Sequence, residues 1–179
     1  MRKHTTIKMH RKLVLLVGAV LLINFNYFAQ TEEEETTTRD SSRVMGADIN
    51  VIIPPTGFLA KQEINGYLNP EYSAGIILSV VPGVSYLKIM EGMTEDFFTT
   101  NKLVKVSEEK MTSANGTKGV LYIATFMLEG IEFMRYTALY GDLSKTIWVN
   151  ITYPSKYKEL MDDEMRKSLN TLTLTPEKR

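Results

Sequence analysis

The sequence predicts an α+β fold, with a central, mostly antiparallel sheet of about five to seven strands and two main helices. Two observations predict it. Strand-like and helix-like segments follow one another in the order β-β-β-α-β-β-β-β-α, which is not the alternation of a doubly wound parallel sheet. Tight-turn signals such as Asn115-Gly116 separate the later strand-like segments, and connections this short join antiparallel strands.

The first part of the domain holds strand-like segments that end at prolines. Residues 48–53 (DINVII) are predicted to form a buried strand, because they are mostly apolar and two prolines follow them. Residues 57–63 are a shorter candidate strand. Residues 75–81 (GIILSVV) are apolar almost throughout, so this strand is expected to be covered on both faces of the sheet.

A helix is predicted over residues 85–99, with Ser85 as its N-cap. Apolar residues at spacings of four, three and four form one stripe on it: Tyr86, Met90, Met93 and Phe97. Gly92 lowers the stability of such a helix by about 1 kcal/mol relative to alanine, and a second short helix from residue 94 is an alternative. We interpret the stripe as core packing, with an adaptable binding groove as the alternative.

Four strands are predicted after this helix, over residues 103–113, 118–128, 131–140 and 146–153. Gly116, Gly130 and Gly141 mark the turns between them. A final amphipathic helix is predicted over residues 155–168, with Ser155 as its N-cap. Its helically spaced residues are Tyr157, Leu160, Met161, Glu164, Met165, Ser168 and Leu169. Alternation over residues 171–175 (TLTLT) predicts a short last strand.

Residues 1–30 have the pattern of a secretory signal peptide. A basic segment precedes the apolar residues 13–23, and a polar exit follows them. Cleavage is expected near Ala29 or Gln30. An uncleaved anchor is the alternative, although the stretch from Leu13 to Ala29 is interrupted by asparagines and is shorter than the about 20 residues of a membrane span. The folded part is therefore expected to be exported, periplasmic or extracellular, with no permanent membrane span if the signal is cleaved.

The rest of the chain is predicted to be an acidic tether followed by one domain. Residues 31–44 are rich in Thr, Ser and Glu and have no aliphatic side chain before Val44, so we expect a disordered acidic linker. Residues 45–179 are the single folded domain. Five of the 21 Lys and Arg residues, and none of the 21 Asp and Glu residues, lie in residues 1–30. The remaining chain is acidic and lacks the basic footprint of a nucleic-acid-binding protein.

The residue types that most catalytic and metal sites need are missing. The chain has no cysteine, and its two histidines, His4 and His10, lie in the predicted signal peptide. A mature chain without Cys and His has no Ser-His-Asp or Cys-His catalysis, no Cys/His zinc site and no haem ligation by histidine. The S-x-x-K matches at Ser85 and Ser155 lack their companion motifs, and the consecutive acids 162–164 do not converge on a helix. We predict no catalytic residue, no metal site and no cofactor.

Arg135 is a candidate ligand-binding residue. It lies in the middle of a predicted strand, on the face that also carries Phe133, Thr137 and Leu139. A charge on a mostly apolar face is either paired or functional. A structural ion pair or an exposed strand end is the first interpretation, and binding of the carboxylate or phosphate of a ligand is the alternative.

A second candidate is a partner-binding surface that we call the aromatic patch. Alternation places three of its side chains on one side of the strand over residues 131–140, opposite to Arg135, and two on one side of the strand over residues 146–153. The aromatic patch consists of Met134, Tyr136, Tyr140, Trp148 and Asn150. Amphipathic aromatic side chains of this kind are typical of binding surfaces. A helix packed over the same face is the alternative.

Residues 47–174 resemble the PsbP-like and DcrB-like fold superfamily. The resemblance rests on IIPPTGF at residues 52–58, IILSVVPGVS at 76–85, WVNITYP at 148–154 and KSLNTL at 167–172. The end of the signal segment, FAQ, resembles those of Bacteroidetes-type bacteria. The resemblance implies an α/β/α sandwich and a non-enzymatic role, since members are photosystem accessory subunits, bacterial envelope proteins and a nuclear-transport protein. The metal-binding histidines and the acylated cysteine of some members have no counterpart here.

These observations favour a non-catalytic, secreted or periplasmic accessory or binding protein. Its unknown partner is expected to be a protein or an envelope component. One alternative is a carrier of a small apolar or lipid-like ligand between sheet and helix, suggested by Met90, Met93, Phe97, Met161 and Met165. A hydrolase that uses only carboxylates is the third hypothesis.

Overall fold

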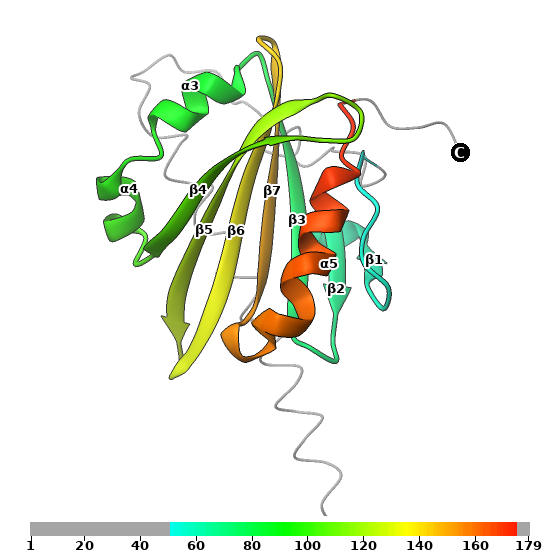
Figure 1. The fold of residues 1–179 in the computed structure, drawn as a ribbon, viewed down its shortest axis with the longest axis vertical. Coiled ribbons are helices and arrows are strands. Elements are labelled where there is room, and N and C mark those ends of the chain that lie inside the picture. The colour runs from blue at the N-terminus through cyan, green and yellow to red at the C-terminus, as the bar shows by residue number, and fades with distance from the viewer. Residues whose placement is uncertain (1–50, 175–179) are drawn as a thin grey trace, which may run out of the picture.

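Most neighbouring strands in the sheet are also consecutive in the sequence, because short turns connect them. The computed structural model describes residues 51–174 (Figure 1). Within them, seven strands form one sheet in the order β1-β2-β3-β7-β6-β5-β4, and every neighbouring pair is antiparallel. The strands are β1 (Leu59–Lys61), β2 (Gly66–Asn69), β3 (Ala74–Pro82), β4 (Val104–Thr112), β5 (Lys118–Leu128), β6 (Ile131–Gly141) and β7 (Lys145–Pro154). The predicted α+β class is confirmed.

One helical crossover joins the two halves of the sheet. After β3 the chain runs through α3 (Tyr86–Glu91) and α4 (Glu95–Thr100) to the far edge strand, β4. A meander of hairpins then returns until β7 pairs with β3 at the centre. Helix α5 (Lys158–Asn170) lies across one face of the sheet, and α3 and α4 lie toward one end of it (Figure 1).

The helix predicted over residues 85–99 is two short helices. The Ser85 hydroxyl accepts from the amide of Leu87 at 3.2 Å, so the predicted N-cap is confirmed. Gly92 ends α3, and the Thr94 hydroxyl then caps α4 by accepting from the amide of Phe97 at 3.3 Å. The weak position at Gly92 thus divides one amphipathic stripe between two helices.

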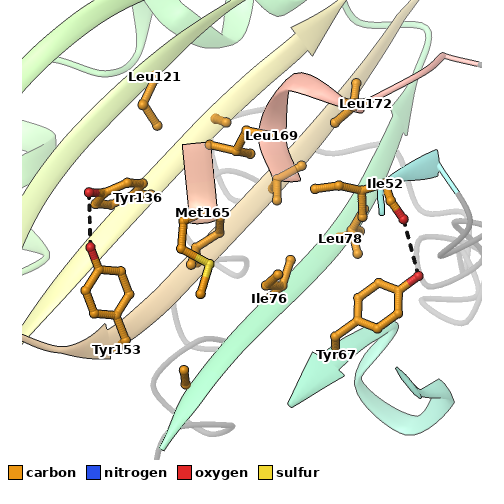
Figure 2. Close-up of a cluster of buried hydrophobic side chains, with 14 of the residues drawn as sticks. Ile52, Tyr67, Ile76, Leu78, Leu121, Tyr136, Tyr153, Met165, Leu169 and Leu172 are labelled. Carbon is orange, nitrogen blue, oxygen red and sulfur yellow. Dashed lines mark hydrogen bonds between the residues drawn. The ribbon is translucent and has the colours of Figure 1, made fainter. Parts of the chain in front are cut away.

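The larger apolar cluster lies between the sheet and α5, on what we call the α5 face. Met161, Met165 and Leu169 of α5 are at most 5 % exposed and pack on tyrosines and aliphatic residues of the sheet (Figure 2). The Tyr153 hydroxyl donates to the Tyr136 hydroxyl at 3.0 Å, which satisfies polar atoms inside this cluster (Figure 2). The predicted inward face of the helix is confirmed at these positions.

Leu160 does not join that face. Its side chain is 56 % exposed, although its spacing suggested burial. Helix α5 begins at Lys158, after a 3-10 turn over Ser155–Tyr157. Ser155 is therefore not the predicted N-cap, because the intervening turn carries it away from the first helical amides; its hydroxyl is buried and has no hydrogen-bond partner within residues 51–174.

Two predicted strands are absent from the described residues. Val51 lies in a 3-10 turn and Ile52 in a bend, although both are buried as expected; residues 48–50 lie outside the described part. Residues 171–174 form a turn and an irregular end, and residue 175 is again outside. The two segments meet through single hydrogen bonds, such as the Thr173 amide to the Val51 carbonyl at 2.9 Å. Isolated bonds of this kind do not make a ladder.

Helix α5 is tied to the edge strand β4 through Arg166. Its Nη1 and Nη2 donate to Glu109 Oε2 and Oε1 at 2.7 and 3.1 Å, and its Nε donates to Asp162 Oδ2 at 3.1 Å. The hydrogen bonds from Arg166 lower the pKa of the Glu109 carboxyl below its usual value. This two-pronged contact joins the helix to the sheet edge.

We expect Glu109→Gln to lower the free energy of unfolding at neutral pH by less than about 1 kcal/mol, because the pair is partly exposed. Since the folded pKa of Glu109 is lowered, its stabilisation is present above the unfolded value of about 4.3 and is lost as pH falls through the folded pKa. Urea unfolding of both proteins across this pH range measures the free energy of unfolding, and the difference between the two proteins should vanish in acid. A difference that grows as the pH falls would contradict the expectation.

Candidate functional site

The sheet register divides the aromatic patch between two faces. Directly opposed residues of an antiparallel pair lie on the same face, and side chains alternate along each strand. Tyr136 is opposite Ile151, whereas Trp148 is opposite Leu139. Tyr136 and Trp148 therefore lie on opposite faces, and the prediction that they form one surface is wrong.

Three members of the aromatic patch belong to the core beneath α5. Tyr136 and Tyr140 are fully buried, and Met134 is 3 % exposed. Burial raises the pKa of Tyr140 to about 12, and its hydroxyl contacts the Met111 sulfur at 3.3 Å. The alternative interpretation, a helix packed over this face, is confirmed for these residues.

The other two members lie on the opposite side, which we call the α3–α4 face. Trp148 is 6 % exposed and belongs to an apolar cluster with Leu139 of β6 and Phe98 of α4. Asn150 is 4 % exposed, and its Oδ1 accepts from the Thr137 hydroxyl at 3.0 Å. Neither side chain offers the exposed surface that partner docking requires.

The methionines suggested as a ligand lining are divided in the same way. Met161 and Met165 pack under α5, whereas Met93 and its partly buried neighbours Met90 and Phe97 pack on the α3–α4 face. The stripe on residues 86–97 is thus core packing, as first interpreted. The two groups do not line one shared interior.

Arg135 occupies the centre of the α3–α4 face. It lies in the middle of β6, opposite Ala124 of β5 and Thr152 of β7, and its side chain is only 3 % exposed. Ion pairs within residues 51–174 join other side chains. Its Nε and Nη2 atoms, and the neighbouring Thr152 Oγ1, are buried without a hydrogen-bond partner in that part of the chain. The first interpretation of Arg135 is therefore wrong for this part of the chain, because the side chain forms no ion pair there and is buried inside the strand and not exposed at its end.

Burial has a clear electrostatic consequence for Arg135. It lowers the pKa of the guanidinium to about 10, because desolvation disfavours the charged form. The group is still protonated at neutral pH. An unpaired buried ion carries an effective penalty of about several kcal/mol, and a desolvated donor without an acceptor adds to it. The site is thus rich in donors and complementary to an anion.

The surroundings of Arg135 suit binding. Thr137, Asn150 and Thr152 offer hydroxyl and amide groups on rigid strands, and the remaining neighbours are apolar. The acidic run at residues 162–164 is elsewhere, where Asp162 pairs with Arg166 and Glu164 pairs with Lys167 at 2.7 Å. Within residues 51–174, no group of three or more acidic or histidine side chains is arranged to hold a metal ion.

The sequence located Arg135 and its neighbours on the same strand, but not its neighbours on the adjacent strands. Alternation correctly placed Phe133, Thr137 and Leu139 beside it on one strand. Ala124 and Thr152 come from other strands, so they depend on the register. The number of residues in the β6–β7 turn is the local signal that identifies Thr152, because it determines which residues face each other.

Among the described residues, no helix combines the length and apolar character that crossing a membrane requires. The predicted signal peptide (residues 1–30) and acidic linker (residues 31–44) lie outside the described residues, so both stay predictions. The single folded domain predicted for residues 45–179 is described only over residues 51–174.

Comparisons with known proteins find similar solved structures but no similar sequence. No family model and no curated protein sequence matches the chain. LpqN of Mycobacterium tuberculosis, a protein involved in cell envelope biogenesis, has a similar structure, with a TM-score of 0.51, 8 % identity, and coverage of 65 % of this chain and 78 % of LpqN. PA94 of Pseudomonas aeruginosa, of unknown function, has a TM-score of 0.47 and 13 % identity over 57 % of this chain and 74 % of its own.

A third solved structure, from Bacteroides thetaiotaomicron, has a TM-score of 0.47 and 13 % identity, over 72 % of this chain and 46 % of its own. None of the three descriptions names the PsbP-like or DcrB-like superfamily, so that resemblance stays a prediction. At these identities the likeness to LpqN shows a shared fold. The fold is thus one that also occurs in LpqN.

Proposed function

We propose that this protein is a non-catalytic binding protein of the bacterial cell envelope that holds a small anionic ligand on its α3–α4 face. The observation that carries the proposal is Arg135, a buried guanidinium whose Nε and Nη2 have no partner within residues 51–174. An anion is the chemical group that removes the penalty of such a site. We prefer binding of a small ligand to docking of a partner protein, because the aromatic patch that would have contacted a partner is buried.

The groups around Arg135 favour binding over catalysis. General acid–base or nucleophilic chemistry needs a base beside a nucleophile or substrate proton. Here the Thr137 hydroxyl donates to the Asn150 amide oxygen, and no carboxylate is paired with Arg135 within residues 51–174. The carrier hypothesis is thus the better supported of the alternatives, with its site moved from the methionines to Arg135.

Location in the envelope rests on two supports. Residues 1–30 have the pattern of an export signal, and the fold resembles that of LpqN, whose described role is in envelope biogenesis. Membership in the PsbP-like and DcrB-like superfamily is part of the same proposal.

Native mass spectrometry of the protein recovered from its own envelope fraction tests the function. The wild type should carry a discrete additional mass that Arg135→Met loses. Lys167→Met is the matched control, because Lys167 is a largely exposed cation on α5 that pairs only with Glu164 in the described part; it should keep the mass. A wild type that is bare, or a ligand retained by Arg135→Met, would overturn the proposal.

A further inference from the structure

The unpartnered atoms of Arg135 share one edge of its guanidinium. Nε and Nη2 both lack hydrogen-bond partners within residues 51–174. Their N–H groups point the same way in the plane of the group, so they form a two-pronged donor. This fork matches the two oxygens of a carboxylate, which accept two parallel hydrogen bonds from it.

Within the described part of the chain, Arg135 is a buried cation without a compensating acidic partner. The row of residues that crosses the sheet at Arg135 continues through Ala124 to Lys105 on β4. Lys105 already pairs with Glu108 at 2.8 Å, and its ammonium lies 5.5 Å from the ring centroid of Phe98. A monoanion therefore neutralises the buried charge, whereas a dianion brings a second buried charge that lacks a partner.

Small residues continue the same row on both sides of Arg135. Ala124 and Thr152 are its direct neighbours, and Gly75 of β3 lies opposite Thr152. Larger aromatic side chains stand on both sides of the row. Phe126 and Phe133 stack with ring centroids 5.4 Å apart on one side, and Tyr122, opposite Thr137, is on the other.

We propose that the ligand of the α3–α4 face is a monocarboxylate with an apolar body, whose carboxylate is held side-on by Arg135 Nε and Nη2. The Thr152 hydroxyl is a third donor, since it is the unpartnered polar neighbour directly across the strand pair. The apolar body lies along the row of Ala124, Thr152 and Gly75, against the aromatic rings. This inference rests on the proposed function and specifies its ligand chemistry.

Titration of the purified full chain with matched probes tests the ligand class. Dodecanoate, below its micelle concentration, supplies a long-chain carboxylate, and 2-naphthoate supplies an aryl carboxylate. Dodecanol and dodecyl phosphate change only the head group. Isothermal calorimetry measures affinity, and the fluorescence of Trp148, the one tryptophan in the chain, reports on the same face. At least one of the two carboxylates should bind at least tenfold tighter than the alcohol and the phosphate. The carboxylate that does so shows whether the apolar body of the ligand is an alkyl chain or an aromatic ring.

Three variants separate the head-group contacts. Arg135→Lys keeps the charge but loses the two-pronged geometry, so carboxylate affinity should fall at least tenfold. Arg135→Met should abolish binding, and Thr152→Val should weaken it about two- to tenfold, the usual range for one hydrogen bond. Lys167→Met should bind as the wild type does. Circular dichroism and thermal unfolding verify that each variant is folded.

The outcomes distinguish the ligand class from the function. Tighter binding of dodecyl phosphate, or equal binding of dodecanol, would overturn the carboxylate assignment. So would full affinity in Arg135→Lys. If no probe binds while the mass retained from the envelope still depends on Arg135, the carboxylate class is wrong and the proposed function stands. If neither a probe nor a retained mass depends on Arg135, both are wrong.

Discussion

Arg135→Met is expected to make the ligand-free protein more stable than the wild type. Methionine fills a similar volume in the apolar surroundings, and it removes a guanidinium whose Nε and Nη2 lack partners within residues 51–174. Replacing buried ionic groups with well-packed apolar ones stabilises proteins by about 1–4 kcal/mol in favourable cases. For a chain of this size, each kcal/mol corresponds to about 2–4 °C in Tm. Urea unfolding and calorimetry of ligand-free protein measure the difference.

The pH dependence of this effect follows from the sign of the pKa shift. Burial lowers the pKa of Arg135 in the folded state to about 10, below its value in the unfolded chain. The cost of burying the charge is therefore fully present at every pH below about 10, neutral pH included. Arg135→Lys, which keeps a buried charge, should not gain stability. A loss of more than about 1 kcal/mol in Arg135→Met would instead indicate that the guanidinium is satisfied in the folded protein.

Gly66→Ala is expected to be strongly destabilising. Gly66 of β2 lies opposite Ile77 of β3, and a Cβ atom at this position would clash with the backbone carbonyl oxygen of Ile76. A backbone atom cannot yield as a flexible side chain does, so β2 and β3 have to separate. We expect a loss at or above about 3 kcal/mol, the upper end of ordinary overpacking costs.

Chemical denaturation of Gly66→Ala, beside a turn glycine as control, measures this loss. Gly130 lies in the β5–β6 turn at φ 78°, and a Cβ atom added to it would meet no atom within 4 Å. Asparagine tolerates that conformation, so Gly130→Asn should stay within about 1 kcal/mol of the wild type. If Gly66→Ala is as stable as Gly130→Asn, then β2 and β3 do not pair in this register.

A stabilising Arg135→Met would connect stability with function. Proteins tolerate locally unfavourable groups at the positions where a ligand is bound, because the ligand supplies the missing interaction. The increase in stability of the empty protein and the loss of ligand in the same variant would then have one cause. The comparison of Arg135→Met with Arg135→Lys separates that cause from general repacking of the α3–α4 face.

The sequence alone determined the elements whose signals are local. Strands β3 to β7 lie where alternation and turn residues placed them, since a strand and its turns depend on neighbours within a few residues. Alternation also placed Arg135 with Phe133, Thr137 and Leu139, because the period of a strand is two. Gly92 was recognised as the weak point at which the helical segment divides.

Only the tertiary structure decided how the faces of different strands combine. The turn from Gly141 to Lys145 pairs Leu139 with Trp148, and a turn with one residue more or fewer would reverse that choice. The predicted aromatic patch was wrong for this reason. The lack of a counterion for Arg135 among residues 51–174 is decided in the same way, because a counterion can come from any strand or helix folded beside it. Pairing across the sheet is a long-range property, which the local periodicity of one strand does not contain.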